Sequence, residues 1–248
     1  MDPVLSAESL TKRFGELLVF EDVSFYAPRG EVVSLLGPSG CGKSTILHII
    51  SGLLLPDRGK VYLKGRDITG STGEMSYMQQ KDLLLPWRKI IDNVALPLQI
   101  QGMDKKRARR EAAHLFAEFG LEGFESVYPS QLSGGMRQRA ALLRTYLFSG
   151  EVLLLDEPFA RLDAVTTRKL HTWFKNVLQK LDSTVLFITH DIEEALHLSD
   201  RIYLLSPRPA RLVKEIEVAS SAKSAEDLKE EILCLLETSS LHKEDICL

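Results

Sequence analysis

Residues 37–44 have the types and spacing of a loop that binds phosphate groups. They read G-P-S-G-C-G-K-S, which fits the pattern G-x-x-x-x-G-K-[S/T], and they lie between an apolar run and a helical pattern. In such loops glycines let successive backbone N–H groups face phosphate oxygens, the lysine reaches the β- and γ-phosphates, and the final hydroxyl ligates Mg²⁺. We therefore expect Lys43 and Ser44 to bind a nucleoside triphosphate with its magnesium ion. The full set predicted to bind nucleotide here is Gly37, Pro38, Ser39, Gly40, Cys41, Gly42, Lys43, Ser44 and Thr45.

Two more apolar runs end in residues that could act on a phosphate group. Asp156 and Glu157 follow one run, and His190 follows another. Asp156 would hold the magnesium shell, Glu157 would orient and polarise an attacking water molecule, and His190 would contact the γ-phosphate and that water. Carboxylates or a histidine at the end of a strand more often have a structural role. Because a phosphate loop is present in the same chain, we favour the catalytic interpretation.

These residues need a scaffold that brings the ends of several strands together. Four continuous apolar runs are typical of parallel strands covered on both faces. They are residues 32–36, 152–155, 185–188 and 202–205. Ligands of such sheets bind beyond the carboxyl ends of the strands, which is where the candidate residues lie. Alternating patterns at 4–10 and 17–26 indicate a small antiparallel sheet beside this core. The sequence therefore predicts an α/β fold.

The remaining patterns are helical. Residues from about 86 to 130 have helical periodicity, with Asp104 as a plausible cap for the helix that follows it. We interpret the basic cluster at 105–110 as a solvated helix face, because the chain is acidic overall. Residues 224–227 form a capping-box pattern, and apolar residues at helical spacing follow. We expect a short tail helix that packs on the core through Leu228, Ile232, Leu235 and Leu236.

Composition limits the classes of function. The chain has 248 residues, of which 44% are hydrophobic and 26% charged, and its formal net charge is −3. These values are typical of a soluble globular protein, and the acidic total argues against a nucleic-acid partner. The sequence has neither a signal peptide nor an apolar run approaching about 18 residues. We expect any membrane contact to go through a partner.

The three cysteines indicate a reducing, cytoplasmic environment. Cys41, Cys234 and Cys247 are odd in number and have no C-x-x-C spacing, so neither a disulfide framework nor a zinc site is expected. Cys41 occupies a variable position of the phosphate loop. We interpret it as a bystander, whose alkylation would nevertheless cost nucleotide binding.

Residues 132–139 read L-S-G-G-M-R-Q-R. They narrow further the class of nucleotide-binding protein to which the chain could belong. Ser133 can cap a helix, and Gly134 and Gly135 expose N–H groups to an anion. The octapeptide resembles the signature motif of the ATP-binding subunits of ATP-binding cassette (ABC) transporters. That resemblance implies that these residues bind the γ-phosphate of an ATP molecule held on a second subunit. The chain would then act as a dimer that sandwiches two ATP molecules.

Three other positions match motifs of the same family. Gln80 matches the glutamine that links magnesium and water to the transmembrane partner; Gln79 is its neighbour, and residues 81–87 favour Gln80. Asp163 resembles the residue of the D-loop, which crosses the dimer interface, although Arg161 is bulkier than expected there. Phe14 fits the aromatic residue that stacks on adenine, a position that core or surface filler occupies nearly as often.

The resemblance covers residues 4 to about 215 and implies a fold in detail. That fold is a P-loop NTPase (RecA-like) parallel-sheet core with a small antiparallel β subdomain and a helical subdomain that carries the signature. We expect the ATPase domain at 1–215, with the helical subdomain inserted at about 86–150, and a helical tail at 216–248. Residues 80–98 resemble the importer branch that handles nitrate, sulfonates, taurine and thiamine precursors.

The resulting hypothesis is the ATPase subunit of an importer, located at the cytoplasmic face of the membrane. Its partners would be a second ATPase subunit, a permease bound through the Gln80 loop and residues 83–87, and, indirectly, an extracytoplasmic solute-binding protein. Internal packing is an equal alternative for residues 83–87. A cassette that acts on nucleic acid or a macromolecular complex is the alternative function, and a GTPase or small-molecule kinase fits less well because the Asn-Lys-x-Asp guanine motif is absent. The transported solute is chosen by the permease and binding protein, so this sequence does not name it.

Overall fold

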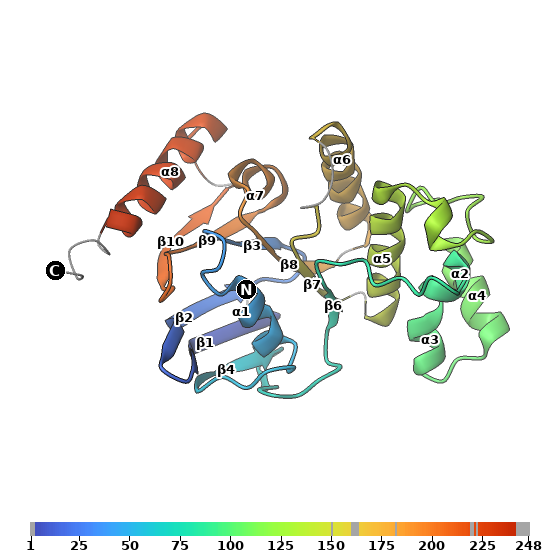
Figure 1. Cartoon of the computed structure of the whole chain (residues 1–248), viewed down its shortest axis with the longest axis horizontal. Coiled ribbons are helices and arrows are strands. Elements are labelled where there is room, and N and C mark those ends of the chain that lie inside the picture. The colour runs from blue at the N-terminus through green and yellow to red at the C-terminus, as the bar shows by residue number, and fades with distance from the viewer. Residues whose placement is uncertain are drawn as a thin grey trace. The chain divides into compact units, whose positions relative to one another are not determined.

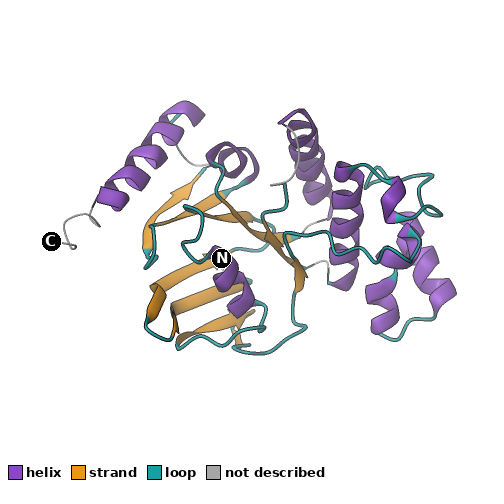
Figure 2. Cartoon of the chain, in the orientation of Figure 1, coloured by secondary structure: helices purple, strands orange, loops and turns teal. Residues whose placement is uncertain are grey.

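The computed structural model describes residues 3–149, 151–159, 164–181, 183–218, 221 and 223–241. The chain divides into two compact units. The first unit consists of Met1–Glu74 and Thr184–Leu248, and the second consists of Met75–Ser183. Figure 1 labels their elements, and Figure 2 shows that both contain strands and helices.

The first unit contains the antiparallel sheet that the alternating patterns predicted. Strands β1 (Leu5–Phe14) and β2 (Leu17–Ala27) form a hairpin, and β4 (Arg58–Leu63) and β5 (Arg66–Asp67) continue the sheet in the order β2-β1-β4-β5. Gly15 turns the hairpin with a positive φ of 55°, a conformation that glycine adopts without strain. The pairing of β1 is interrupted by register shifts on both of its edges.

The first unit also contains parallel strands, as predicted from the continuous apolar runs. Strand β3 (Val32–Leu36) pairs in parallel with β8 (Thr184–Thr189) on one side and with β9 (Arg201–Leu205) on the other. Strand β10 (Leu212–Glu217) adds to β9 in the antiparallel direction. Helices α1 (Lys43–Ile50) and α7 (Ile192–Leu198) begin shortly after β3 and β8. The ends of β3 and β8 therefore each lead into a short loop and a helix.

A helix at the predicted tail position, α8 (Ala225–Leu241), closes the described part of the first unit. Ser224 and Asp227 bond reciprocally at its start, because the Ser224 hydroxyl oxygen accepts from the Asp227 N–H and the Asp227 carboxylate accepts from the Ser224 N–H. The helix packs against α7, β9 and β10 through an apolar cluster. The buried members of this cluster are Leu36, Ala195, Ile202, Leu204, Ile216, Leu228 and Ile232, and Leu235 and Leu236 are partly buried against it.

The second unit combines two parallel strands with helices. Strand β6 (Ser76–Met78) pairs with β7 (Val152–Asp156), which is buried along its whole length. The helices are α2 (Ile90–Val94), α3 (Leu96–Ile100), α4 (Lys105–His114), α5 (Gly134–Phe148) and α6 (Ala164–Leu181). Both α2 and α3 pack on α5. Among the described residues, no helix has the length and apolar character needed to cross a bilayer.

Two details of the second unit sharpen the helical prediction. Asp104 lies at the N-cap of α4, but its side chain makes no capping hydrogen bond. The basic face of α4 is partly neutralised within the unit, because the Arg109 guanidinium binds both carboxylate oxygens of Asp92 at 2.8 and 2.7 Å. That ion pair lowers the pKa of the Asp92 carboxyl. Part of the basic cluster thus holds α4 against α2.

Candidate functional site

The phosphate loop of the first unit is closed around its lysine. Helix α1 begins at Lys43, whose ammonium donates hydrogen bonds to the carbonyl oxygens of Gly37 at 2.7 Å and of Pro38 at 2.9 Å. The Lys43 side chain is therefore directed into the curl of its own loop, and the residue is only 5% exposed. The N-terminus of α1 also carries the positive end of the helix dipole. A lysine and a helix N-terminus at one point make an anion site.

Neighbouring backbone and side chains leave no room for larger residues at two of the loop glycines. Gly42 has a φ of 119°, and a Cβ atom there would lie 2.7 Å from Val19 Cγ1 of β2. A Cβ atom at Gly37 would lie 3.0 Å from the Leu205 carbonyl oxygen. A side chain at Gly42 would require Val19 to shift and would be strained by the positive φ, and one at Gly37 would be tight against β9. The loop is thus shaped by packing on β2 and β9 as well as by its own sequence.

Phe14 is carried by the same hairpin that packs on the phosphate loop. It lies at the end of β1, where it pairs with Leu17 at the start of β2, while Val19 of β2 contacts the loop. Its ring is 49% exposed, and the Lys12 ammonium lies 5.4 Å from the ring centroid. An exposed ring in this hairpin has an open face for stacking, so the adenine-binding prediction for Phe14 stands as a prediction.

His190 leaves the sheet beside the phosphate loop. The register of β3 and β8 pairs Leu36 with Thr189, so the next residues, Gly37 and His190, leave neighbouring strands at the same edge. His190 is exposed, whereas Thr189 is buried. Asp191 caps α7 with its carboxylate, which accepts from the N–H groups of Glu193 at 2.8 Å and Glu194 at 3.1 Å. The predicted phosphate contact of His190 is compatible with this placement.

In the second unit, strand register brings together two of the predicted residues. Because Met78 pairs with Leu155 in the parallel ladder, Gln80 and Glu157 lie two residues beyond a matched pair. The Gln80 amide nitrogen donates a hydrogen bond of 2.8 Å to a Glu157 carboxylate oxygen. Gln80, rather than Gln79, therefore contacts the predicted catalytic carboxylate.

The carboxylates at the end of β7 differ in environment. Asp156 is 8% exposed and accepts a hydrogen bond of 3.3 Å from the Tyr77 hydroxyl. Burial, and then the charge of Asp156, raise the pKa of the Tyr77 hydroxyl well above its usual range, so it remains a donor. Glu157 is partly exposed and has a φ of 44°, a conformation that is strained for a residue other than glycine. Backbone strain of this kind clusters at functional sites.

The signature octapeptide begins helix α5, as predicted. Ser133 is the N-cap, and its hydroxyl oxygen accepts from the Met136 N–H at 3.3 Å. Leu132 is buried and anchors the segment, while Ser133 and Gly134 are exposed. The start of a fifteen-residue helix is therefore accessible at Ser133 and Gly134. A second chain could supply an anion at this point.

Helix α5 is also bonded to the segments that follow Gln80 and Glu157, which sequence reasoning missed. The Arg144 guanidinium donates to the carbonyl oxygens of Asp82 at 2.6 Å and Leu83 at 2.7 Å. The Gln138 amide donates to the carbonyl oxygen of Pro158, directly after Glu157. Arginine and glutamine on a helix surface give no sequence signal of such contacts, because their partners lie elsewhere in the chain.

The segment predicted to meet a permease is part buried and part exposed. Leu84 is buried, whereas Leu83 is 50% and Trp87 71% exposed. The buried Asn93 amide fixes the loop by accepting from the Leu85 N–H and donating to the Leu85 and Arg88 carbonyl oxygens. Trp87 borders an open hollow of about 390 Å³. The other residues that line it are Arg88, Lys89, Asp92, Gln99, Lys105, Arg109 and Tyr128.

The predicted site residues divide between the two units. The phosphate loop, Phe14 and His190 lie in the first, and Gln80, Asp156, Glu157 and the signature lie in the second. Asp163 and its neighbour Arg161 fall outside the described residues.

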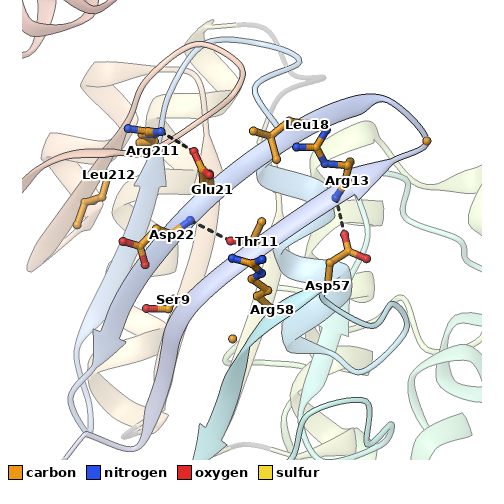
Figure 3. A pocket seen from close by; sticks show the side chains of 12 residues that line it. Ser9, Thr11, Arg13, Leu18, Glu21, Asp22, Asp57, Arg58, Arg211 and Leu212 are labelled. Atoms are coloured by element: carbon orange, nitrogen blue, oxygen red, sulfur yellow. Dashed lines mark hydrogen bonds and ion pairs between the residues drawn. The ribbon is translucent and has the colours of Figure 1, made fainter.

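A second hollow, of about 940 Å³, lies on the antiparallel sheet of the first unit (Figure 3). It is lined by none of the predicted residues. Its charged groups are of both signs and several are paired: Arg211 binds Glu21, and the Arg13 N–H donates to the Asp57 carboxylate. The balanced charge does not suit a nucleotide, so we do not assign this hollow to ATP.

Comparison with known proteins gives a consistent result. A family model described as ABC transporter matches residues 20–160. The formylaminopyrimidine import ATP-binding protein ThiZ of Halalkalibacterium halodurans is 48% identical over 200 residues, which cover 81% of this chain and 78% of ThiZ. The taurine import ATP-binding protein TauB of Escherichia coli O157:H7 is 40% identical, over 86% of this chain and 84% of TauB.

Solved structures agree with the fold. The dimeric structure of MJ0796, a bacterial ABC transporter cassette, superposes with a TM-score of 0.73 at 30% identity and covers 86% of this chain and 98% of that one. A dimeric post-hydrolysis state of the same cassette, bound to ADP and Pi, gives a TM-score of 0.72 at 29% identity, over 86% of this chain and 98% of that one.

Proposed function

The chain belongs to the ABC transporter family and is an ATP-binding ATPase, and from this premise we propose that it powers a membrane importer for a small solute. The import direction is supported by the relatives, which include ATP-binding proteins of formylaminopyrimidine and taurine import. We place the chain peripherally at the cytoplasmic face of the membrane, attached through a permease. A solute of the size and polarity of those relatives' substrates is the class we expect.

The observation that carries the proposal is the hydrogen bond between Gln80 and Glu157. It holds the carboxylate of Glu157 at the end of β7, where an exposed oxygen can accept a proton from water. The water oxygen then attacks the γ-phosphorus, the bond to the ADP oxygen breaks, and ADP and phosphate leave. His190 stabilises charge on the transferred phosphoryl group.

The residues present fit ATP and Mg²⁺. The ammonium of Lys43, held on carbonyl oxygens of its loop, exchanges these for phosphate oxygens. Ser44 and Asp156 would supply hard oxygen ligands, the type that Mg²⁺ prefers, while water and phosphate complete its shell. Among the described residues no group of three or more His, Cys, Asp or Glu could hold a metal, which suits a site that takes most of its ligands from the nucleotide. When bound, the ion neutralises charge on the β- and γ-phosphate oxygens.

Two further partners belong to the proposal. A second copy of the chain, or a similar cassette, would present its Ser133 segment to the nucleotide, which is supported by the dimeric form of the structural relatives. A permease would dock at the exposed Leu83 and Trp87 beside the basic hollow. A nucleic-acid role gains no support, because the helices within residues 75–149 have at most fifteen residues and form no long coiled coil.

The variant Glu157→Gln tests the proposal. The amide cannot accept the proton of the attacking water, so ATP hydrolysis should fall by at least about a hundredfold while ATP binding persists. We expect gel filtration with Mg-ATP to show a trapped dimer. Glu122→Gln, an exposed carboxylate of the same unit, is the matched control and should behave as the unmodified chain. A Glu157→Gln chain that stays monomeric and hydrolyses ATP at the normal rate would refute the role of Glu157.

A further inference from the structure

Glu194 is a buried acidic residue that the proposed mechanism does not use. It lies in the first turn of α7 and is 6% exposed. One of its carboxylate oxygens accepts a hydrogen bond from the Thr189 hydroxyl. Burying a carboxylate costs free energy unless hydrogen bonds compensate for the lost water. A hydrogen bond between a buried hydroxyl and a buried carboxyl group therefore lies directly beside His190.

This hydrogen bond belongs to a network that joins the residues directly before and after His190 in the chain. The Thr189 hydroxyl oxygen also accepts from the Asp191 N–H at 3.0 Å, so it bridges the residues before and after His190. The Asp191 carboxylate in turn accepts from the first turn of α7. The backbone of His190 is thereby tied to α7, while its side chain remains exposed.

Both ends of this network are fixed to the body of the first unit. Thr189 is 1% exposed and pairs with Leu36 in the β3–β8 ladder. Helix α7 is held by Ala195, which is fully buried in the apolar cluster shared with α8. A side chain that joins two rigid elements restricts the loop between them, and small displacements of a catalytic group are costly.

We infer that Glu194 is a positioning residue for His190, acting through the Thr189 hydroxyl. The Glu194 carboxyl group fixes the backbone of the turn that contains His190. With this backbone fixed, the His190 imidazole extends from the end of β8 toward the nucleotide of the proposed site. This inference rests on the proposed function, because it requires His190 to act on the phosphoryl group. Glutamine at position 194 keeps an oxygen acceptor for Thr189, whereas alanine removes it.

The experiment measures Mg-ATP hydrolysis by the full-length chain for Glu194→Ala, Glu194→Gln, His190→Ala and the double variant Glu194→Ala/His190→Ala. We expect Glu194→Ala to lower kcat by about tenfold to a hundredfold, with KM for ATP within about twofold, because substrate binding is not altered. Glu194→Gln should retain most of the activity. Glu193→Ala is the matched control, since the neighbouring side chain is exposed and pairs with Lys229.

The decisive readout is the double variant. If Glu194 acts through His190, adding Glu194→Ala to His190→Ala lowers kcat no further, whereas a purely structural role gives losses that multiply. Multiplying losses would overturn the inference. If His190→Ala alone left kcat unchanged, that result would instead contradict the proposed function.

A second pair of variants guards against misfolding of Glu194→Ala. Thr189→Val removes the hydroxyl at nearly constant volume and should reproduce the loss in kcat, again with no further loss in the His190→Ala background. Thr189→Ser keeps the hydroxyl and should retain activity. A fully active Thr189→Val chain would overturn the inference, since no bridge would then be required.

Discussion

At the scale of single residues, the phosphate loop shows how a binding site can exist before its ligand arrives. Lys43 is held by two carbonyl oxygens of its own loop, and these are neutral acceptors. Phosphate oxygens carry negative charge and form stronger hydrogen bonds with an ammonium group. Nucleotide binding thus exchanges weaker partners for stronger ones while Gly42, packed against Val19, keeps the loop in shape. Little conformational entropy is lost on binding.

Cys41 lies in this loop, but its thiol is buried and not accessible to reagents. It is 1% exposed. Burial raises the pKa of the Cys41 thiol, and the Lys43 ammonium lowers it by less, so little reactive thiolate forms near neutral pH. Modification of Cys41 therefore requires the loop to open first.

The burial of Cys41 makes a prediction about reaction rates. In a Cys247→Ser background, N-ethylmaleimide at pH 7.5 (roughly the usual assay pH) should modify the exposed Cys234 at least about tenfold faster than Cys41, because local opening precedes reaction of a buried group. Peptide mass spectrometry after short pulses measures both rates in one sample. The Cys41 rate should rise as pH increases, since its raised pKa places thiolate formation at higher pH. Similar rates at neutral pH would show that the loop is open.

At the scale of elements, the sequence predicted those parts whose signals are local. The apolar runs correspond to β3, β7, β8 and β9, and the glycine-lysine pattern fixes the start of α1. Contacts between residues that are distant in the sequence could not be predicted. Gln80 and Glu157 are 77 residues apart, and only the register of β6 with β7 brings them together.

The buried Arg201 is a further example. Its guanidinium pairs with three carboxylates from two places in the sequence, Glu31 and the neighbouring Glu215 and Glu217 of β10. Charged residues at such spacings are read as solvated, because no local pattern distinguishes a buried ion pair from an exposed one. Strand β10, which supplies two of these carboxylates, was not predicted for the same reason: its polar residues mask the strand pattern.

Helix α8 offers a test at this scale. Ile232 is fully buried in the cluster with α7 and β9, whereas its neighbour Leu233 is 42% exposed. Ile232→Ala should weaken the attachment of α8 by about 2–5 kcal/mol, the cost of truncating a buried side chain. Leu233→Ala, the adjacent control, should change it by less than about 0.5 kcal/mol. Hydrogen exchange of the α8 amides measures the opening free energy. Equal effects of the two variants would mean that α8 is not docked through this face.

At the scale of the whole molecule, the proposed chemistry is distributed. The first unit carries the phosphate loop and His190, and the second carries Glu157, Gln80 and the signature. In the proposed dimer, the signature that completes a site would come from another copy. Ser133 and Gly134 at the start of α5 are exposed, so a second chain can reach them. Symmetry then places two equivalent sites in a dimer, each built from the phosphate loop of one chain and the signature of the other.

Mixing two inactive variants tests this arrangement. Ser133→Arg should leave ATP binding largely intact but abolish hydrolysis, and Lys43→Ala should disable the phosphate loop. Neither variant alone forms an intact site. In a mixed dimer, however, the loop of the Ser133→Arg chain meets the signature of the Lys43→Ala chain. Because half of the dimers in an equal mixture are mixed and each has one of two sites intact, about a quarter of the unmodified activity should return.

A matched pair of variants separates this outcome from nonspecific rescue. Lys43→Ala and Glu157→Gln both alter the half of the site that a single chain supplies, so every site in their mixed dimer has one defect. Their mixture should remain inactive at all ratios. No recovery in the first mixture, despite dimer formation with Mg-ATP, would mean that a chain completes its own site with its own signature. Recovery in the control would instead mean that Lys43 and Glu157 of one site come from different chains. The ratio dependence adds a quantitative check, because the recovered activity should be greatest at equal amounts of the two chains and fall off symmetrically on either side.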